Sequence, residues 1–198
     1  MRPQLMISRL TSLQDARSSA AVGFDLVGFS LTRGDHRKLS VSMAWNIVQW
    51  LTGPRIVLEI DSPSLPELEA ALAQFPVHHA SLPLADAGLT LPAGLGAPIL
   101  RGDAQAGVDA WAAALADGEP LGELWLPDVP AVQPFGALLP RLLLHFARLE
   151  DAVDFLRTAE QLPYGFAFGT EAEEEPGVLD YARIDSFLEL FFDRCGTD

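Results

Sequence analysis

The sequence predicts a single (β/α)8 barrel, the TIM-barrel architecture, over residues 1–198. Short apolar runs alternate with amphipathic stretches eight times, which is the order of a parallel sheet covered by helices. A length of 198 residues is close to the lower end of what one such barrel needs, and no linker or low-complexity tract interrupts the pattern. Apolar residues make up 49% of the chain and charged residues 20%, which is enough to build one buried core.

The first half of the barrel is predicted from four apolar runs. The expected strands cover residues 5–10, 24–30, 55–60 and 77–82, and the expected helices cover 13–22, 42–51 and 65–74. Ser12 and Asp15 have the spacing of a capping box at the start of the first helix, and Gly23 is typical of its end. The Gly- and Pro-bearing stretch after the fourth run indicates that no regular helix follows it.

The second half repeats the alternation. Strands are expected at 98–101, 122–126, 142–146 and 164–168, and helices at 105–116, 149–160 and 181–194, with a short helical piece near Phe135. In a parallel barrel the carboxyl ends of all strands lie on one rim, and the loops there carry the function. We therefore expect a small-molecule ligand at the carboxyl-terminal rim.

Charge and composition exclude several classes of function. The formal net charge of −14 comes from 13 basic and 27 acidic side chains, and it disfavours binding to nucleic acid or to anionic membranes. The sequence begins without a long apolar segment, so we expect neither export nor a membrane span, and a cytoplasmic location. Cys195 is the only cysteine, which excludes an internal disulfide and a Cys-rich metal site.

Neither a metal nor a cofactor is expected. His78 and His79 are adjacent in a predicted strand, so their side chains point to opposite faces and cannot chelate one metal together; one of them should face the barrel interior. No phosphate-cradling or dinucleotide-binding glycine motif is present. Trp45, Trp50 and Trp111 fall on expected helices and are interpreted as core or interface residues of a monomer or homodimer.

Both ends of the chain resemble phosphoribosylanthranilate isomerase, the barrel that performs an Amadori rearrangement in tryptophan biosynthesis. Residues 5–11 (LMISRLT) are similar to the first strand of that family, residues 15–17 (DAR) to its first helix, and residues 23–25 (GFD) and 28–29 (GF) to its second strand. Residues 176–180 (PGVLD), followed by an amphipathic helix, are similar to its last loop and helix. The resemblance implies the same barrel and a phosphorylated aminosugar as the family substrate.

The resemblance also implies where a catalytic base and acid would stand. Ser8 occupies the position of the family's cysteine base, Met6 replaces a nearby lysine, and Asp128 lies where the family has its aspartate acid. A serine without an adjacent base cannot replace a tuned thiolate, so Ser8 is interpreted as a small filler. Arg37 matches an arginine that contacts the substrate carboxylate, and Arg101 matches another family arginine. The alternatives are a turn residue for Asp128, a solvated charge for Arg37 and a structural salt bridge for Arg101.

The substrate phosphate of the family is held by glycine-rich turns after strands seven and eight. Here His145 begins the segment that replaces the first glycine pair, and Gly169 and Thr170 are followed by Glu171 in place of the phosphate-binding glycine. A carboxylate beside a phosphate is repulsive, and Arg148 is the nearest obvious counter-charge. The acidic run after Thr170 is otherwise typical of a solvated loop.

Three functions follow as hypotheses. The first is a divergent barrel that lacks the standard isomerase activity. The second is an active isomerase with Asp128 as acid and with Glu59 or His145, both predicted at the functional rim, as the replacement base. The third is a non-catalytic barrel that binds a ligand or a partner.

Overall fold

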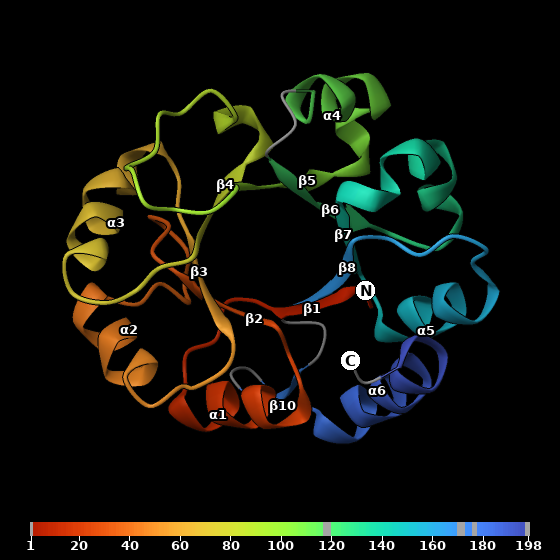
Figure 1. The fold of residues 1–198 in the computed structure, drawn as a ribbon, viewed down its shortest axis with the longest axis horizontal. Helices are drawn as coiled ribbons and strands as arrows, with labels where there is room; N and C mark the ends of the chain where they lie inside the picture. Colours follow the sequence, from red (N-terminus) through yellow and green to blue (C-terminus); the bar gives the residue numbers. More distant parts are fainter. Residues whose placement is uncertain (1, 117–119, 170–172, 176–177, 197–198) are drawn as a thin grey trace.

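The computed structural model describes residues 2–116, 120–169, 173–175 and 178–196, and in this part of the chain eight parallel strands close into a barrel (Figure 1). Each strand pairs with its neighbours in sequence order, and β1 closes the barrel against β8. The TIM-barrel prediction is confirmed. The strands are β1 Gln4–Ile7, β2 Leu26–Ser30, β3 Arg55–Glu59, β4 His79–Pro83, β5 Ile99–Asp103, β6 Leu121–Leu126, β7 Leu142–Phe146 and β8 Gly165–Phe168.

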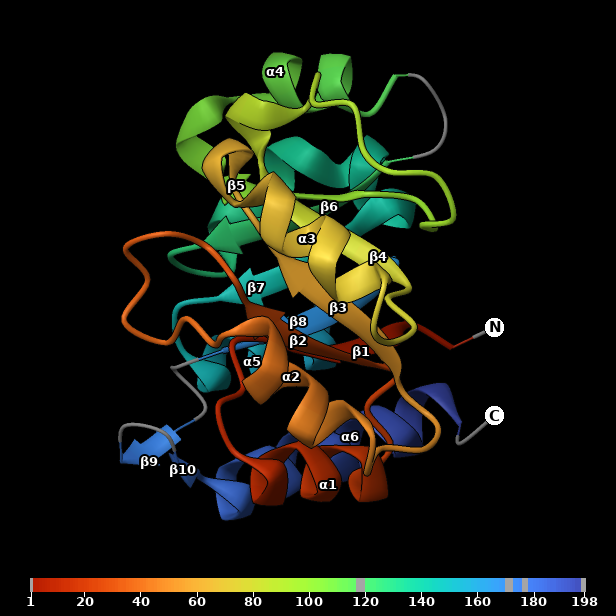
Figure 2. The same ribbon diagram turned by 90° about the vertical axis from the view of Figure 1, so that its left-hand side faces the viewer.

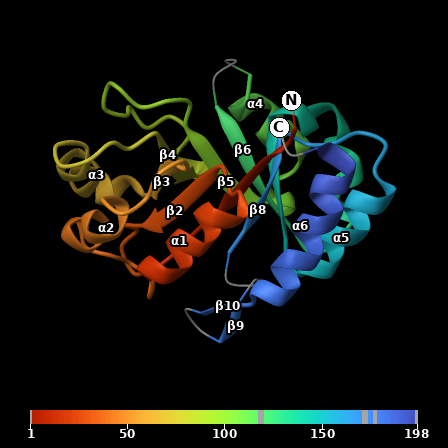
Figure 3. The same cartoon turned by 60° about the horizontal axis from the view of Figure 1, so that its bottom comes forward.

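Helices surround the barrel on its outside (Figures 1 and 3). The α-helices are α1 Leu13–Val22, α2 Val41–Val48, α3 Leu65–Leu72, α4 Val108–Ala114, α5 Leu149–Thr158 and α6 Tyr181–Cys195. The 3-10 segments are η1 Ser62–Ser64, η2 Leu84–Asp86, η3 Ala104–Ala106 and η4 Pro130–Arg141. The bounds of α1 match the prediction, because the Ser12 hydroxyl accepts a hydrogen bond from the Asp15 amide and Gly23 adopts a φ of 101°.

Two connections lack an α-helix. As predicted, η2 after β4 is followed by a stretch without regular helix. After β6, Pro134 and Pro140 lie inside η4. A proline inside an α-helix lacks the backbone donor, and its ring clashes with the carbonyl four residues earlier, so an α-helix is disfavoured in this segment.

The core consists of an interior cluster and an outer shell. Strand alternation turns every second side chain inward, and most of the other apolar residues pack between the sheet and the helices. His79 pairs in register with Val57 and is buried, which agrees with the expectation that one of the two adjacent histidines faces inward. The interior apolar cluster consists of Met6, Leu26, Val57, Ile99, Leu143 and Ala167.

Two details differ from the predictions. Glu173–Glu175, expected in a loop, form β9, which pairs antiparallel with β10 (Val178–Leu179). This hairpin lies at one end of the barrel, and the start of β1 and the end of α6 lie toward the other end (Figure 2). Trp50 was predicted on a helix as a core or interface residue. It follows the end of α2 and is 64% exposed, so it is not a core residue, and the interface role stays a prediction.

Within the described residues, no helix combines the length and the apolar character needed to cross a membrane.

Candidate functional site

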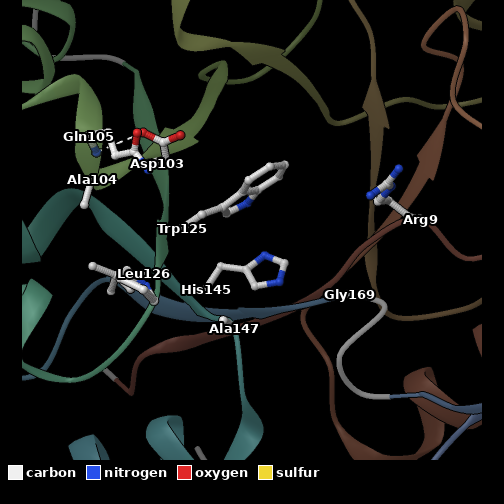
Figure 4. A pocket seen from close by; sticks show the side chains of 10 residues that line it. Arg9, Asp103, Ala104, Gln105, Trp125, Leu126, His145, Ala147 and Gly169 are labelled. Atoms are coloured by element: carbon white, nitrogen blue, oxygen red, sulfur yellow. Dashed lines mark hydrogen bonds between the residues drawn. The ribbon is translucent and has the colours of Figure 1, made fainter.

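A cavity of about 530 Å³ opens at the carboxyl rim of the barrel. Its walls come from the ends of β5 to β7, the start of the loop after β8 and the segment after β1, so it lies where barrel loops usually bind ligands. The lining residues are Arg9, Asp103, Ala104, Gln105, Trp125, Leu126, Pro127, His145, Ala147 and Gly169, shown in Figure 4.

A buried carboxylate organises one wall of this cavity. Glu123 is 1% exposed, and its Oε1 atom accepts hydrogen bonds from His145 Nδ1 at 2.8 Å and from Trp125 Nε1 at 3.0 Å. The two rings meet edge to face, with centroids 5.7 Å apart, and both project toward the cavity (Figure 4). Glu123 therefore fixes the orientation of both rings and places the Nδ1 proton of His145 toward itself.

The facing wall carries Arg9, which stands across the cavity from Trp125 (Figure 4). Its guanidinium forms an ion pair with Asp35, with an NH2 to Oδ1 distance of 2.8 Å. Ser30 and the Arg37 backbone amide also donate to Asp35. Burial alone would raise the pKa of Asp35. The hydrogen bonds and the charge of Arg9 together have a larger effect and lower this pKa to about 2.

Arg9 also carries a backbone feature that is uncommon for its residue type. Its φ is 61°, in the left-handed region, and within the described chain no other residue besides glycine has a positive φ. Such a conformation costs free energy and persists where surrounding contacts hold it, which is frequent at functional sites. The pair with Asp35 is one such contact.

A second buried carboxylate lies on an inward position of β3. Glu59, at the end of β3, is 4% exposed, and its Oε1 has no hydrogen-bond partner among the described residues. Burial raises its pKa to about 7, and the negative charge of Glu123 adds to this effect, whereas Arg101 opposes it. Burial also raises the pKa of Glu123, but the hydrogen bond from His145 opposes this effect, and the pKa of Glu123 is lowered.

Two neighbouring carboxyl groups whose pKa values shift in opposite directions are typical of sites that both donate and accept protons. Glu59 can carry a proton near neutral pH, whereas Glu123 stays ionised and holds His145. Of these groups, His145 lines the cavity directly and can exchange a proton with a bound molecule.

Ser8 follows β1 at the same rim as Gly169, as the barrel predicts. It is buried, its hydroxyl donates to the Phe168 carbonyl at 3.0 Å, and it is absent from the cavity lining. A β-carbon on Gly28 would lie 3.1 Å from the Ser8 α-carbon, so the strands approach closely here. These contacts suit a small residue.

The three other polar candidates have local partners. Asp128 is exposed two residues after β6, outside the cavity lining, and accepts a hydrogen bond from the Ala131 amide as a turn residue does. Arg37 is buried, so its interpretation as a solvated charge is wrong. Arg101 is buried and donates to the carbonyls of Ser81 and Ile60 rather than forming the expected salt bridge with a described carboxylate.

Of the residues predicted for phosphate binding, His145 and Gly169 line the cavity. Thr170 and Glu171 lie outside the described residues, so their roles stay predictions. In the described part of the chain, no group of three or more potential ligands could hold a metal ion.

Sequence reasoning missed Glu123, Trp125, Arg9 and Asp35. One signal pointed to Glu123: a glutamate at an inward position inside an apolar strand is costly unless it is paired, and such residues mark functional sites. Trp125 has the same inward parity, two residues further along β6.

These features define a (β/α)8 barrel with a carboxylate-supported cavity at its carboxyl rim. Among solved structures, the fold is that of phosphoribosylanthranilate isomerases, as the sequence resemblance implied. The enzyme from Thermus thermophilus is 18% identical, with a TM-score of 0.76 over 96% of this chain and 98% of that chain. A monomeric form of the Thermotoga maritima enzyme is 18% identical, with a TM-score of 0.75 over 96% of this chain and 99% of that chain. The Pyrococcus furiosus enzyme is 10% identical, with a TM-score of 0.72 over 97% of this chain and 100% of that chain.

No protein-family model and no curated protein matches the sequence. The likeness is therefore one of fold.

Proposed function

We propose that this chain is a diverged barrel of the phosphoribosylanthranilate isomerase type that binds a small molecule at its carboxyl rim and does not catalyse the family reaction. The observation that carries the proposal is the hydrogen bonding and the position of Ser8. Its hydroxyl donates to the Phe168 carbonyl and stands apart from the cavity, so it has no role there as a base.

The charges around the rim support the same proposal. Arg148, the nearest counter-charge expected for a phosphate, forms hydrogen bonds of 2.8 and 2.9 Å with Asp151, and Arg9 is paired with Asp35. A phosphate would have to compete with these carboxylates and, as the sequence predicts, with Glu171. We infer that the family's phosphorylated substrate binds poorly.

Rescue of a tryptophan-requiring strain that lacks its own isomerase tests this proposal. We expect no growth with the wild-type chain, and none with Ser8→Cys, because a thiol at this position still lacks a phosphate site. Soluble expression of both chains and rescue by a known isomerase are the controls. Growth supported by the wild-type chain would overturn the proposal, and growth with Ser8→Cys alone would mean that the phosphate site is intact.

An active isomerase with a substitute base is the second candidate, and one observation favours it: His145 lines the cavity and is held by Glu123. Glu59 is a weaker candidate because it is buried outside the cavity lining. If growth occurred, His145→Asn would distinguish the two, since loss of a general base typically lowers the rate about a hundred- to ten-thousand-fold.

We further propose that the protein is a monomer or a homodimer. The Thermotoga maritima enzyme is a dimer of which monomers have been generated. Light scattering separates the two states.

A further inference from the structure

We propose that the rim cavity selects an aromatic organic cation, such as a benzyl ammonium compound, rather than an anion. This inference rests on the proposed small-molecule site and names the class of ligand. It follows from the exposed indole of Trp125, from the partners of the nearby arginines and from an acceptor atom left without a donor.

Trp125 provides the binding surface. The side chain is 39% exposed although it stands on an inward position of β6, and its indole projects into the cavity (Figure 4). The hydrogen bond from Nε1 to Glu123 fixes the ring, so little conformational entropy is lost when a ligand stacks on it. The face of an indole attracts cations through its quadrupole.

The positive groups near the cavity already have acceptors. Arg9, the guanidinium in the described lining, is paired with Asp35 through Nε and NH2 at 3.3 and 2.8 Å. Arg101 is buried outside the cavity lining, and its two terminal nitrogens donate to carbonyl and hydroxyl oxygens of Ser81, Ile60 and Thr32. An incoming anion would therefore have to displace existing partners.

Acceptors, in contrast, are in surplus. Oε2 of Glu123, whose carboxyl group stays ionised, is buried without a hydrogen-bond partner among the described residues. Glu123 lies directly behind the two aromatic rings, and Asp103 adds a carboxylate to the cavity lining. Carboxylates close to a cavity of low polarity produce a negative potential, which favours a positive ligand and disfavours a negative one.

Tryptophan fluorescence with matched probes tests the inference. We would titrate the Trp50→Phe protein, which lacks a strongly exposed indole outside the cavity, with benzyltrimethylammonium and with phenylacetate at about 0.15 M salt, where distant charges are screened. We expect the ammonium probe to bind about ten-fold more tightly, as a cation on an indole implies. Competition with inorganic phosphate should be negligible.

Three variants in this background locate the source of the preference. Glu123→Gln keeps an oxygen acceptor for both rings but removes the charge, and we expect it to abolish most of the preference. Asp103→Asn, at an exposed position that cannot disturb the core, should reduce the preference more mildly. Asp154→Asn is the matched control, because it removes one charge from the exposed surface of α5 and should leave the preference unchanged.

The outcomes separate the two proposals. Tighter binding of phenylacetate, or equal binding of both probes, would overturn the cation inference while leaving a small-molecule site. A preference reduced equally by all three substitutions would assign it to the net charge of −14 and would also overturn the inference. Binding of neither probe would contradict the small-molecule site itself.

Discussion

Replacing Gly165 by alanine is expected to lower the free energy of unfolding by about 3 kcal/mol or more, at the upper end for overpacked interior sites. A β-carbon at this position would lie 2.3 Å from the Gln4 carbonyl oxygen and 2.6 Å from Leu143 Cδ2. Gly165 pairs with both residues where β8 lies between β7 and β1. The backbone of Gln4 cannot move without disturbing the closure of the barrel.

Urea unfolding measures this effect, and Gly136→Ala is the matched control. Gly136 lies in η4, where an added β-carbon meets no atom within 4 Å, so the same change should alter stability by less than about 0.5 kcal/mol. Equal stability of the Gly165→Ala protein and the wild type would mean that β1, β7 and β8 do not close as described.

Replacing Glu59 by glutamine is expected to stabilise the protein above neutral pH and to have little effect at pH 5. Burial raises the pKa of Glu59 to about 7, from 4.5 in an unfolded chain. Between these values the folded state binds more protons than the unfolded state, so wild-type stability falls as the pH rises. A shift of this size corresponds to about 3 kcal/mol at pH 8, and glutamine, which does not ionise, avoids that loss.

Unfolding curves at pH 5, 6, 7 and 8 test this expectation. Glu69→Gln, the same substitution at an exposed position of α3, controls for the loss of one negative charge. A Glu59→Gln protein whose advantage over the wild type does not grow between pH 5 and pH 8 would contradict the account of a carboxyl group protonated in the barrel.

The sequence predicted the fold well because the signals of this fold are local. Apolar runs bounded by Gly and Pro marked the strands, and the bounds of α1 could be read from Ser12 and Gly23. For Trp50 the sequence left a core role and an interface role open, because a tryptophan near the end of a helix can face either the sheet or solvent, and only the packing decides.

The site was less predictable because its contacts join distant parts of the chain. Glu123 and His145 are 22 residues apart and meet because β6 and β7 pair in register, and Arg9 finds Asp35 across the loops after β1 and β2. His145 and Gly169 were chosen from the family pattern and do line the cavity, whereas Asp128, chosen in the same way, lies outside it. A family pattern gives positions along strands, but the partners of a side chain depend on the residues that have changed around it.

The most direct measurement is turnover of phosphoribosylanthranilate by the purified wild-type protein, with a phosphoribosylanthranilate isomerase as the positive control. We expect no rate above the buffer background, because Ser8 is hydrogen-bonded to a backbone carbonyl. Arg9, the arginine among the described lining residues, is paired with Asp35, so an anionic substrate would have to compete with that carboxylate. Turnover that saturates with substrate and is lost in His145→Asn would contradict the proposed loss of activity and would identify His145 as the replacement base.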